Sequence, residues 1–197
     1  MRKLTYYVAL TVDGYIAGPG GEFDFFPMAA TMEFINAHYP ETMPTAARTA
    51  LGTDGLPNQH FDTCLQGRGS YEIALKEGVT SPYAHLRQYV FSRTLGPESP
   101  DPAVELVAAD PLAKVRELKA EDGGLGIWLV GGGTLATALL PEIDELIVKL
   151  YPVVAGAGIR MFEGPDAGFA PRAFTLKDVT TLDSGANVLR YERDGQG

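Results

Sequence analysis

The pattern of hydrophobic and polar positions along this chain predicts eight strands. Each predicted segment is rich in β-branched and aromatic residues and is bounded by turn-forming residues, as is typical of strands. In the sixth segment, period-2 alternation places Ile147, Lys149 and Tyr151 on one face. The eight ranges are Arg2–Thr11, Phe61–Gln66, Arg87–Ser92, Val104–Val107, Gly126–Val130, Ile143–Tyr151, Phe174–Thr181 and Asn187–Tyr191.

Four segments between these strands predict helices. Four apolar residues in the first lie near helical spacing, and in the third Asp110 followed by Pro111 is typical of an N-cap and a first helical position. The ranges are Pro27–His38, Ser70–Lys76, Asp110–Lys119 and Gly133–Leu140.

The order of these elements predicts an α/β fold. Early strands that alternate with helices indicate crossover connections and a mostly parallel central sheet, whereas the last two strands, with no helix between them, indicate an antiparallel C-terminal pair. A chain of 197 residues suits one domain over 1–197. Two long connections, 38–60 and 152–172, are expected either to cover a site or to form an interface.

Charge and cysteine content narrow the classes of partner. The formal net charge is -9 and no cluster of Lys and Arg occurs, which argues against nucleic acid or an anionic membrane as the main partner. No stretch approaches the length of a membrane span, and the N-terminal apolar stretch is interrupted by Asp13, so we expect a cytoplasmic protein. Cys64 is the only cysteine, which excludes an internal disulfide and a cysteine-rich metal site.

Three consecutive glycines follow the apolar segment Trp128–Val130 and lead into a small-residue helix. Such a junction brings bare backbone N–H groups and the positive end of a helix dipole to one place, which favours a bound diphosphate. A tight turn with close packing is the alternative, and the motif alone leaves both open. A Rossmann motif is excluded by the spacing and by the late position in the chain.

Four segments in order make the chain similar to a known family: 7–17, 67–72, 89–94 and the triple glycine, with 144–162 as a fifth. Together they resemble the dihydrofolate reductase superfamily, most closely the branch that contains the reductase domain of the bacterial riboflavin-pathway deaminase-reductase and many stand-alone reductases. The resemblance spans Arg2 to about Arg193. It implies that superfamily's mixed sheet, NADPH as cofactor, a small heterocyclic substrate and a homodimer.

The resemblance also implies which residues contact the cofactor. Arg68 and Arg93 would bind phosphate groups, with Ser70 and Ser92 nearby, while Ala9 and the loop after it would border the nicotinamide. The alternatives are that the two arginines are ordinary solvated charges and that the loop is a simple turn. The expected contacts are Ala9, Gly14, Ile16, Gly67, Arg68, Ser70, Ser92, Arg93, Gly131, Gly132, Gly133, Thr134 and Leu135.

Three polar residues are the candidates for catalysis. Asp13 lies in the first loop, Asp24 precedes the first helix, and Lys149 interrupts an apolar strand. A snorkelling or ion-paired side chain is the alternative for Lys149, and it is the commoner situation. No metal site is expected.

The expected reaction is reduction of the riboflavin-biosynthesis type, on 5-amino-6-(5-phosphoribosylamino)uracil or another pyrimidine- or pterin-like heterocycle. Dihydrofolate reductase activity is one alternative, although the segment Phe23–Pro27 lacks the family's tryptophan. A non-catalytic NADP-binding module is a second. A serine hydrolase is not favoured, because no G-x-S-x-G motif occurs.

Overall fold

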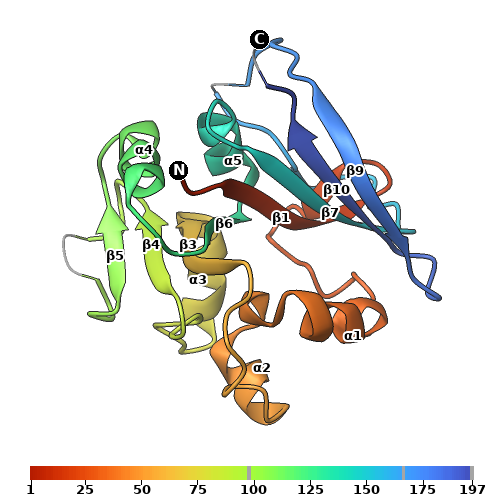
Figure 1. The fold of residues 1–197 in the computed structure, drawn as a ribbon, viewed down its shortest axis with the longest axis horizontal. Helices are drawn as coiled ribbons and strands as arrows, with labels where there is room; N and C mark the ends of the chain where they lie inside the picture. The colour runs from red at the N-terminus through yellow and green to blue at the C-terminus, as the bar shows by residue number, and fades with distance from the viewer. Residues whose placement is uncertain (97–98, 166, 196–197) are drawn as a thin grey trace.

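An eight-stranded sheet forms the centre of the computed structural model, which describes residues 1–96, 99–165 and 167–195 (Figure 1). Its strand order is β5-β4-β3-β6-β1-β7-β10-β9. The six strands from β5 to β7 run parallel, and β10 is antiparallel to both β7 and β9. The strands are β1 (Leu4–Thr11), β3 (Phe61–Gly67), β4 (Arg87–Phe91), β5 (Val104–Val107), β6 (Gly126–Gly131), β7 (Glu145–Tyr151), β9 (Phe174–Thr181) and β10 (Asn187–Arg193).

These eight strands confirm the expected mixed, mostly parallel sheet with an antiparallel C-terminal pair, and each lies within two residues of its predicted bounds. The four expected helices are also present, with Asp110 accepting a hydrogen bond from the Leu112 amide at the start of α4. They are α1 (Ala29–His38), α3 (Arg68–Lys76), α4 (Pro111–Ala120) and α5 (Gly133–Leu139).

The helices cover both faces of the sheet. Residues of α4 and α5 join Leu65 and Tyr89 in one buried cluster, whereas Tyr71 of α3 packs against Val90 on the opposite face. The face that carries Tyr7 packs against residues of α1 (Figure 1). Neighbouring strand residues point to opposite faces, which explains this division.

The sequence analysis missed four small elements. The strands β2 (Tyr15–Ala17) and β8 (Ile159–Arg160) pair with each other, and the long connection 38–60 contains η1 (Pro40–Thr42) and α2 (Thr45–Ala50). This connection is held to the sheet by the buried Glu41 carboxylate, which accepts the His60 and Phe61 amides at 2.6 and 3.0 Å. Elements this short carry too little periodicity to be recognised in a sequence.

Candidate functional site

The predicted cofactor motifs meet at one edge of the sheet. In the strand register, Gln66 on β3 is paired with Gly131 on β6, and Gly67 is paired with Phe91 on β4. The carboxyl ends of three neighbouring strands therefore present the 67–72, 89–94 and triple-glycine segments side by side. Ligands of open α/β sheets commonly bind at this edge.

Two helices begin here without a side-chain cap. Gly67 is the N-cap of α3 and Gly132 the N-cap of α5, and among the described residues no side chain caps either helix. Neither first turn contains an acidic residue. A Cβ atom at Gly67 would lie only 3.4 Å from the Gly132 amide nitrogen, so the two helix N-termini are close together. Paired helix N-termini of this kind favour a bound anion.

The three consecutive glycines, Gly131, Gly132 and Gly133, have different close neighbours. Gly131 has a φ of +150° and is joined to Gly132 by a cis peptide bond. A Cβ at Gly131 would lie 3.3 Å from Ser70 Oγ, and one at Gly132 would lie 3.9 Å from the same oxygen. A Cβ at Gly133 would collide with the Arg160 carbonyl oxygen. Close packing against the connection 152–172 therefore accounts for Gly133, while Gly131 and Gly132 face Ser70.

The connection 152–172 covers the start of α5, although Asp166 lies outside the described residues. The Glu163 amide donates to the Gly133 carbonyl at 3.4 Å, and a Cβ at Gly164 would lie 3.1 Å from the Thr134 side chain. Leu135 is buried in the core beneath. Thr134 and Leu135 thus follow the glycines within the first turn of α5.

Arg68, Ser92 and Arg93 lie at the same edge. Arg68 donates to Thr94 Oγ1 at 2.7 Å and pairs with Glu72 at 3.5 Å, and its side chain is 52 % exposed. Ser92 Oγ accepts the Thr94 amide at 3.2 Å. Arg93 is exposed and forms no ion pair within the described chain. Both guanidinium groups are open to a ligand, and the exposed pair with Glu72 contributes little stability.

The residues expected at the nicotinamide lie on and after β1. Ala9 is half-buried against the cluster of Phe26 and Tyr151. Gly14 has a φ of +89°, and its amide donates to the Thr11 carbonyl, which closes the turn after β1. Ile16 lies in β2 and packs against the core. The segment therefore contains the expected turn, closed at Gly14, and its Ile16 side chain also packs into the core.

Asp13 fastens two loops together. Its carboxylate accepts hydrogen bonds from Thr11 Oγ1 at 2.7 Å, the Ala155 amide at 3.1 Å and the Gly156 amide at 2.7 Å. The Thr11 hydroxyl is the largest of the causes that lower the Asp13 pKa to about 2. A carboxylate this acidic carries no proton near neutral pH and serves as an anchor. Asp24 lies in the exposed segment before α1 and forms no hydrogen bond with another described residue.

Lys149 is buried but not paired. It lies on β7 in register with Ala9 and Val188, with its side chain on the face that also carries Ile147. The residue is 8 % exposed, and its Nζ lies 4.3 Å from the centre of the Tyr7 ring. Burial lowers the Lys149 pKa to about 8. It forms no ion pair or hydrogen bond within the described chain, so of the two alternatives to a catalytic role, a snorkelling or an ion-paired side chain, the ion pair is not seen.

Sequence reasoning missed Gln66. This residue is 2 % exposed, and its Nε2 has no hydrogen-bond partner among the described residues. It lies two residues after the buried Cys64 on β3 and beside the triple glycine. The sequence did contain a signal for it, because Gln66 is a polar residue at the end of a predicted strand segment. Cys64 itself is a packed strand thiol, as expected, with its pKa raised by burial.

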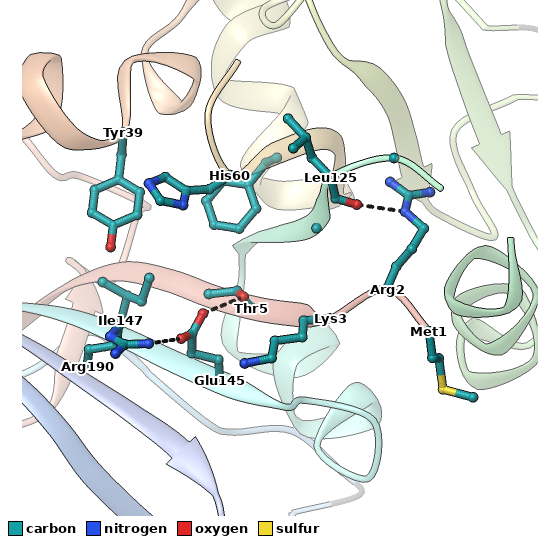
Figure 2. A pocket seen from close by; sticks show the side chains of 13 residues that line it. Met1, Arg2, Lys3, Thr5, Tyr39, His60, Leu125, Glu145, Ile147 and Arg190 are labelled. Atoms are coloured by element: carbon teal, nitrogen blue, oxygen red, sulfur yellow. Dashed lines mark hydrogen bonds and ion pairs between the residues drawn. The ribbon is translucent and has the colours of Figure 1, made fainter. Parts of the chain in front are cut away.

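A cavity of 440 Å³ lies at the opposite edge of the sheet, near the beginnings of β1, β6 and β7 (Figure 2). Inside it the Glu145 carboxylate accepts from Thr5 at 2.9 Å and pairs with Arg190 at 3.0 Å. Figure 2 shows the Tyr39 and His60 rings above this pair. None of the predicted cofactor residues lines this cavity.

Over 1–96, 99–165 and 167–195, no helix has both the length and the apolar character needed to cross a bilayer. Over the same ranges, no group of three or more His, Cys, Asp or Glu side chains is arranged to hold a metal ion.

Comparison with known proteins identifies relatives over nearly the whole chain. The model of the RibD C-terminal domain family matches residues 2–188. The uncharacterized protein YwjB of Bacillus subtilis is 32% identical over 166 residues, covering 82% of this chain and 83% of YwjB. The uncharacterized protein YyaP of the same organism is 30% identical over 209 residues, covering 98% of this chain and 96% of YyaP.

Solved structures share the fold. A Shewanella sp. PV-4 protein whose name assigns it to riboflavin biosynthesis has a TM-score of 0.70 and 21% identity, covering 99% of this chain and 100% of its own. Acinetobacter baumannii RibD has a TM-score of 0.62 and 18% identity, covering 98% of this chain and 58% of its own. The Thermotoga maritima deaminase and 5-amino-6-(5-phosphoribosylamino)uracil reductase has a TM-score of 0.67 and 15% identity, over 98% and 57%. The fold is thus dihydrofolate reductase-like, as the sequence indicated.

Proposed function

The chain belongs to the RibD C-terminal domain family, and from this premise we propose that it is an NADPH-dependent reductase of a pyrimidine-like heterocycle. The observation that carries the proposal is the meeting of three motif segments at the carboxyl ends of β3, β4 and β6. The proposed substrate is 5-amino-6-(5-phosphoribosylamino)uracil, the compound named for the Thermotoga maritima protein.

The residues at this edge fit such a dinucleotide. The uncapped starts of α3 and α5 offer amides to a diphosphate, and Gly131 and Gly132 leave backbone room for it. Arg68 and Arg93 offer cations to the additional 2′-phosphate. The buried Gln66 Nε2 is an unsatisfied donor at the same edge, and a bound acceptor would remove the cost of leaving it unpaired.

The chemistry divides between cofactor and protein. When bound, NADPH would supply the hydride. The chain orients the reacting groups: Ala9 is a small apolar residue where the nicotinamide would lie, and a dry site there protects the hydride path. Reduction of a polar double bond also requires a proton at the heteroatom. Of the three catalytic candidates, we assign this role to Lys149, because Asp13 is an ionised anchor and Asp24 is exposed.

Dihydrofolate reductase activity has less support. The superfamily's dihydrofolate reductases use an acidic residue on the first long helix, and the only acidic residue of α1, Glu33, is exposed. A carboxylate in contact with bulk water cannot give a pterin the desolvated pairing that such substrates need.

The experiment that tests the proposal is a titration with both reduced nicotinamide cofactors. Trp128, the only tryptophan, lies three residues before Gly131 and provides a fluorescence signal. We expect Arg68→Ala to weaken NADPH binding about 10- to 100-fold, because a charge-assisted contact contributes about 1.5–3 kcal/mol, and to leave NADH binding unchanged. Arg116→Ala, which removes an exposed pair with Glu142, is the matched control. Equal weakening of both cofactors would mean that Arg68 does not bind the extra phosphate.

A substrate screen separates the reductase from a non-catalytic NADP-binding module. NADPH oxidation with the uracil substrate supports the reductase, whereas tight binding without turnover over a broad panel of heterocycles supports the module. We also propose a homodimer, for which the exposed Leu176 and Val179 on the edge strand β9 are the support. Light scattering of the purified chain measures this directly.

A further inference from the structure

Two lysines of the described chain are buried, and only one of them, Lys119, forms ion pairs. Lys119 Nζ is held by the Glu142 carbonyl at 2.9 Å and the Asp144 carboxylate at 2.8 Å. Lys149 has no such partner within the described chain. Buried lysines are almost always paired, because an ammonium loses its hydration when it leaves water. The exception at Lys149 therefore needs an explanation.

The surroundings of Lys149 make the unpaired charge more unusual. Its register neighbours are Ala9 on β1 and Val188 on β10, and Ile147 and Tyr151 flank it on β7. The Tyr7 ring, whose centre lies 4.3 Å from Nζ, is the cation–π partner of Lys149 among the residues that the structure describes. A cation over an aromatic face regains only part of the lost hydration. The fold thus holds a positive charge among apolar side chains at the carboxyl end of the sheet.

A second unpaired donor lies on the same face. Gln66 follows Cys64 by two residues on β3, so its side chain points to the face of Cys64 and Tyr7. Its Nε2 is buried without a partner among the described residues. Strands β6 and β1 separate Gln66 from Lys149, a span of about 14 Å at the usual strand spacing. Val130 and Ala9, both half-buried and apolar, lie between them.

We propose that Lys149 is a specificity-determining residue that binds a carbonyl or other electron-rich oxygen of the substrate above Ala9. This inference rests on the proposed function and deepens it, because it names the chemical group that the site selects. An unpaired ammonium attracts oxygen acceptors and repels protonated amidines. The site accordingly selects oxo-pyrimidines, such as uracils, against amino-substituted pyrimidines.

Two planar fragments test this selection without any need for turnover. Uracil presents two carbonyl oxygens, and 2,4-diaminopyrimidine presents two amino groups on a ring of the same size. Binding of each fragment is measured by NMR shift changes of the isotope-labelled protein, with and without NADP. The variants are Lys149→Met, which removes the charge, Lys149→Arg, which keeps it, and Lys177→Met, which removes a half-exposed lysine on β9.

We expect the wild-type chain to bind uracil at least about tenfold more tightly than 2,4-diaminopyrimidine, as a charge-assisted hydrogen bond permits. Lys149→Met should lose this preference for uracil over the diamine, and Lys149→Arg should retain part of it. Lys177→Met should show the same preference as wild type. Thermal unfolding shows that each variant is folded. Unsaturable binding of uracil, equal or tighter binding of the diamine, or unchanged uracil affinity in Lys149→Met would overturn the inference. Failure of NADPH binding in the cofactor titration would instead overturn the proposed function.

Discussion

Replacing Lys149 by methionine should stabilise the protein, whereas the same change at Lys119 should destabilise it. Both side chains are buried, at 8 % exposed for Lys149 and 5 % for Lys119, and methionine matches the length and much of the volume of lysine. Only Lys119 contacts carboxylates, those of Glu142 and Asp144. The two substitutions therefore separate the effect of burying a charge from the effect of breaking an ion pair.

The magnitude follows from the pKa of Lys149, which burial lowers from 10.5 to about 8. That difference of about 2.5 pKa units corresponds to about 3 kcal/mol at 1.36 kcal/mol for each unit. At pH 7 the wild-type chain bears this cost in full, and methionine removes it. For a chain of this size each kcal/mol shifts the unfolding midpoint by roughly 2–4 °C, so Lys149→Met should unfold about 6–12 °C higher. Lys119→Met should lose about 3–5 kcal/mol, the usual cost of breaking a buried pair.

The assay is thermal unfolding between pH 7 and pH 10.5. Between pH 8 and pH 10.5 the unfolded chain binds a proton at Lys149 that the folded chain has released, so wild-type stability gains from rising pH over this window. The advantage of Lys149→Met over wild type should consequently shrink as the pH approaches 10.5. A midpoint for Lys149→Met below that of wild type at pH 7 would contradict this prediction, because it would show that the folded chain compensates the ammonium.

Three further outcomes are expected. The His85 ring, whose Nε2 lies 2.8 Å from the Glu41 carbonyl, has its pKa lowered by burial. As the pH drops below about 6.5, the unfolded state therefore gains this proton first, and the stability of the folded chain should fall. In thermal unfolding, the midpoint of His85→Gln should depend less steeply on pH over this range than that of wild type. Gly133→Ala should destabilise the chain measurably in urea unfolding, because its Cβ would meet the Arg160 carbonyl, whereas Gly55→Ala has open space around it and should not. Cys64 should react with a thiol reagent only on unfolding, since burial raises its pKa, and rapid reaction of the native chain would contradict its place in the core.

The sequence predicted the sheet well because its signals are local. Runs such as Ile143–Tyr151 are rich in β-branched, aromatic and other apolar residues, and the pair Asp110–Pro111 indicates where α4 begins. The β2–β8 pair was missed because Tyr15–Ala17 and Ile159–Arg160 are too short for periodicity and become strands only through contact with each other. The same limit applies to the site. The bonds that turn Asp13 into an anchor come from Ala155 and Gly156, far along the chain, and no local pattern contains them.

Lys149 also bears on the choice between an enzyme and a binding module. A module that only holds NADPH needs the amides, glycines and arginines at the ends of β3, β4 and β6, all of which stand apart from Lys149 on β7. Such a module would gain stability from an apolar residue at this position, because the unpaired ammonium costs about 3 kcal/mol by its lowered pKa. The charge makes physical sense when a second ligand lies above Ala9 and accepts its hydrogen bond. A stabilised Lys149→Met variant that binds NADPH normally but has lost its preference for uracil would therefore favour the reductase over the module.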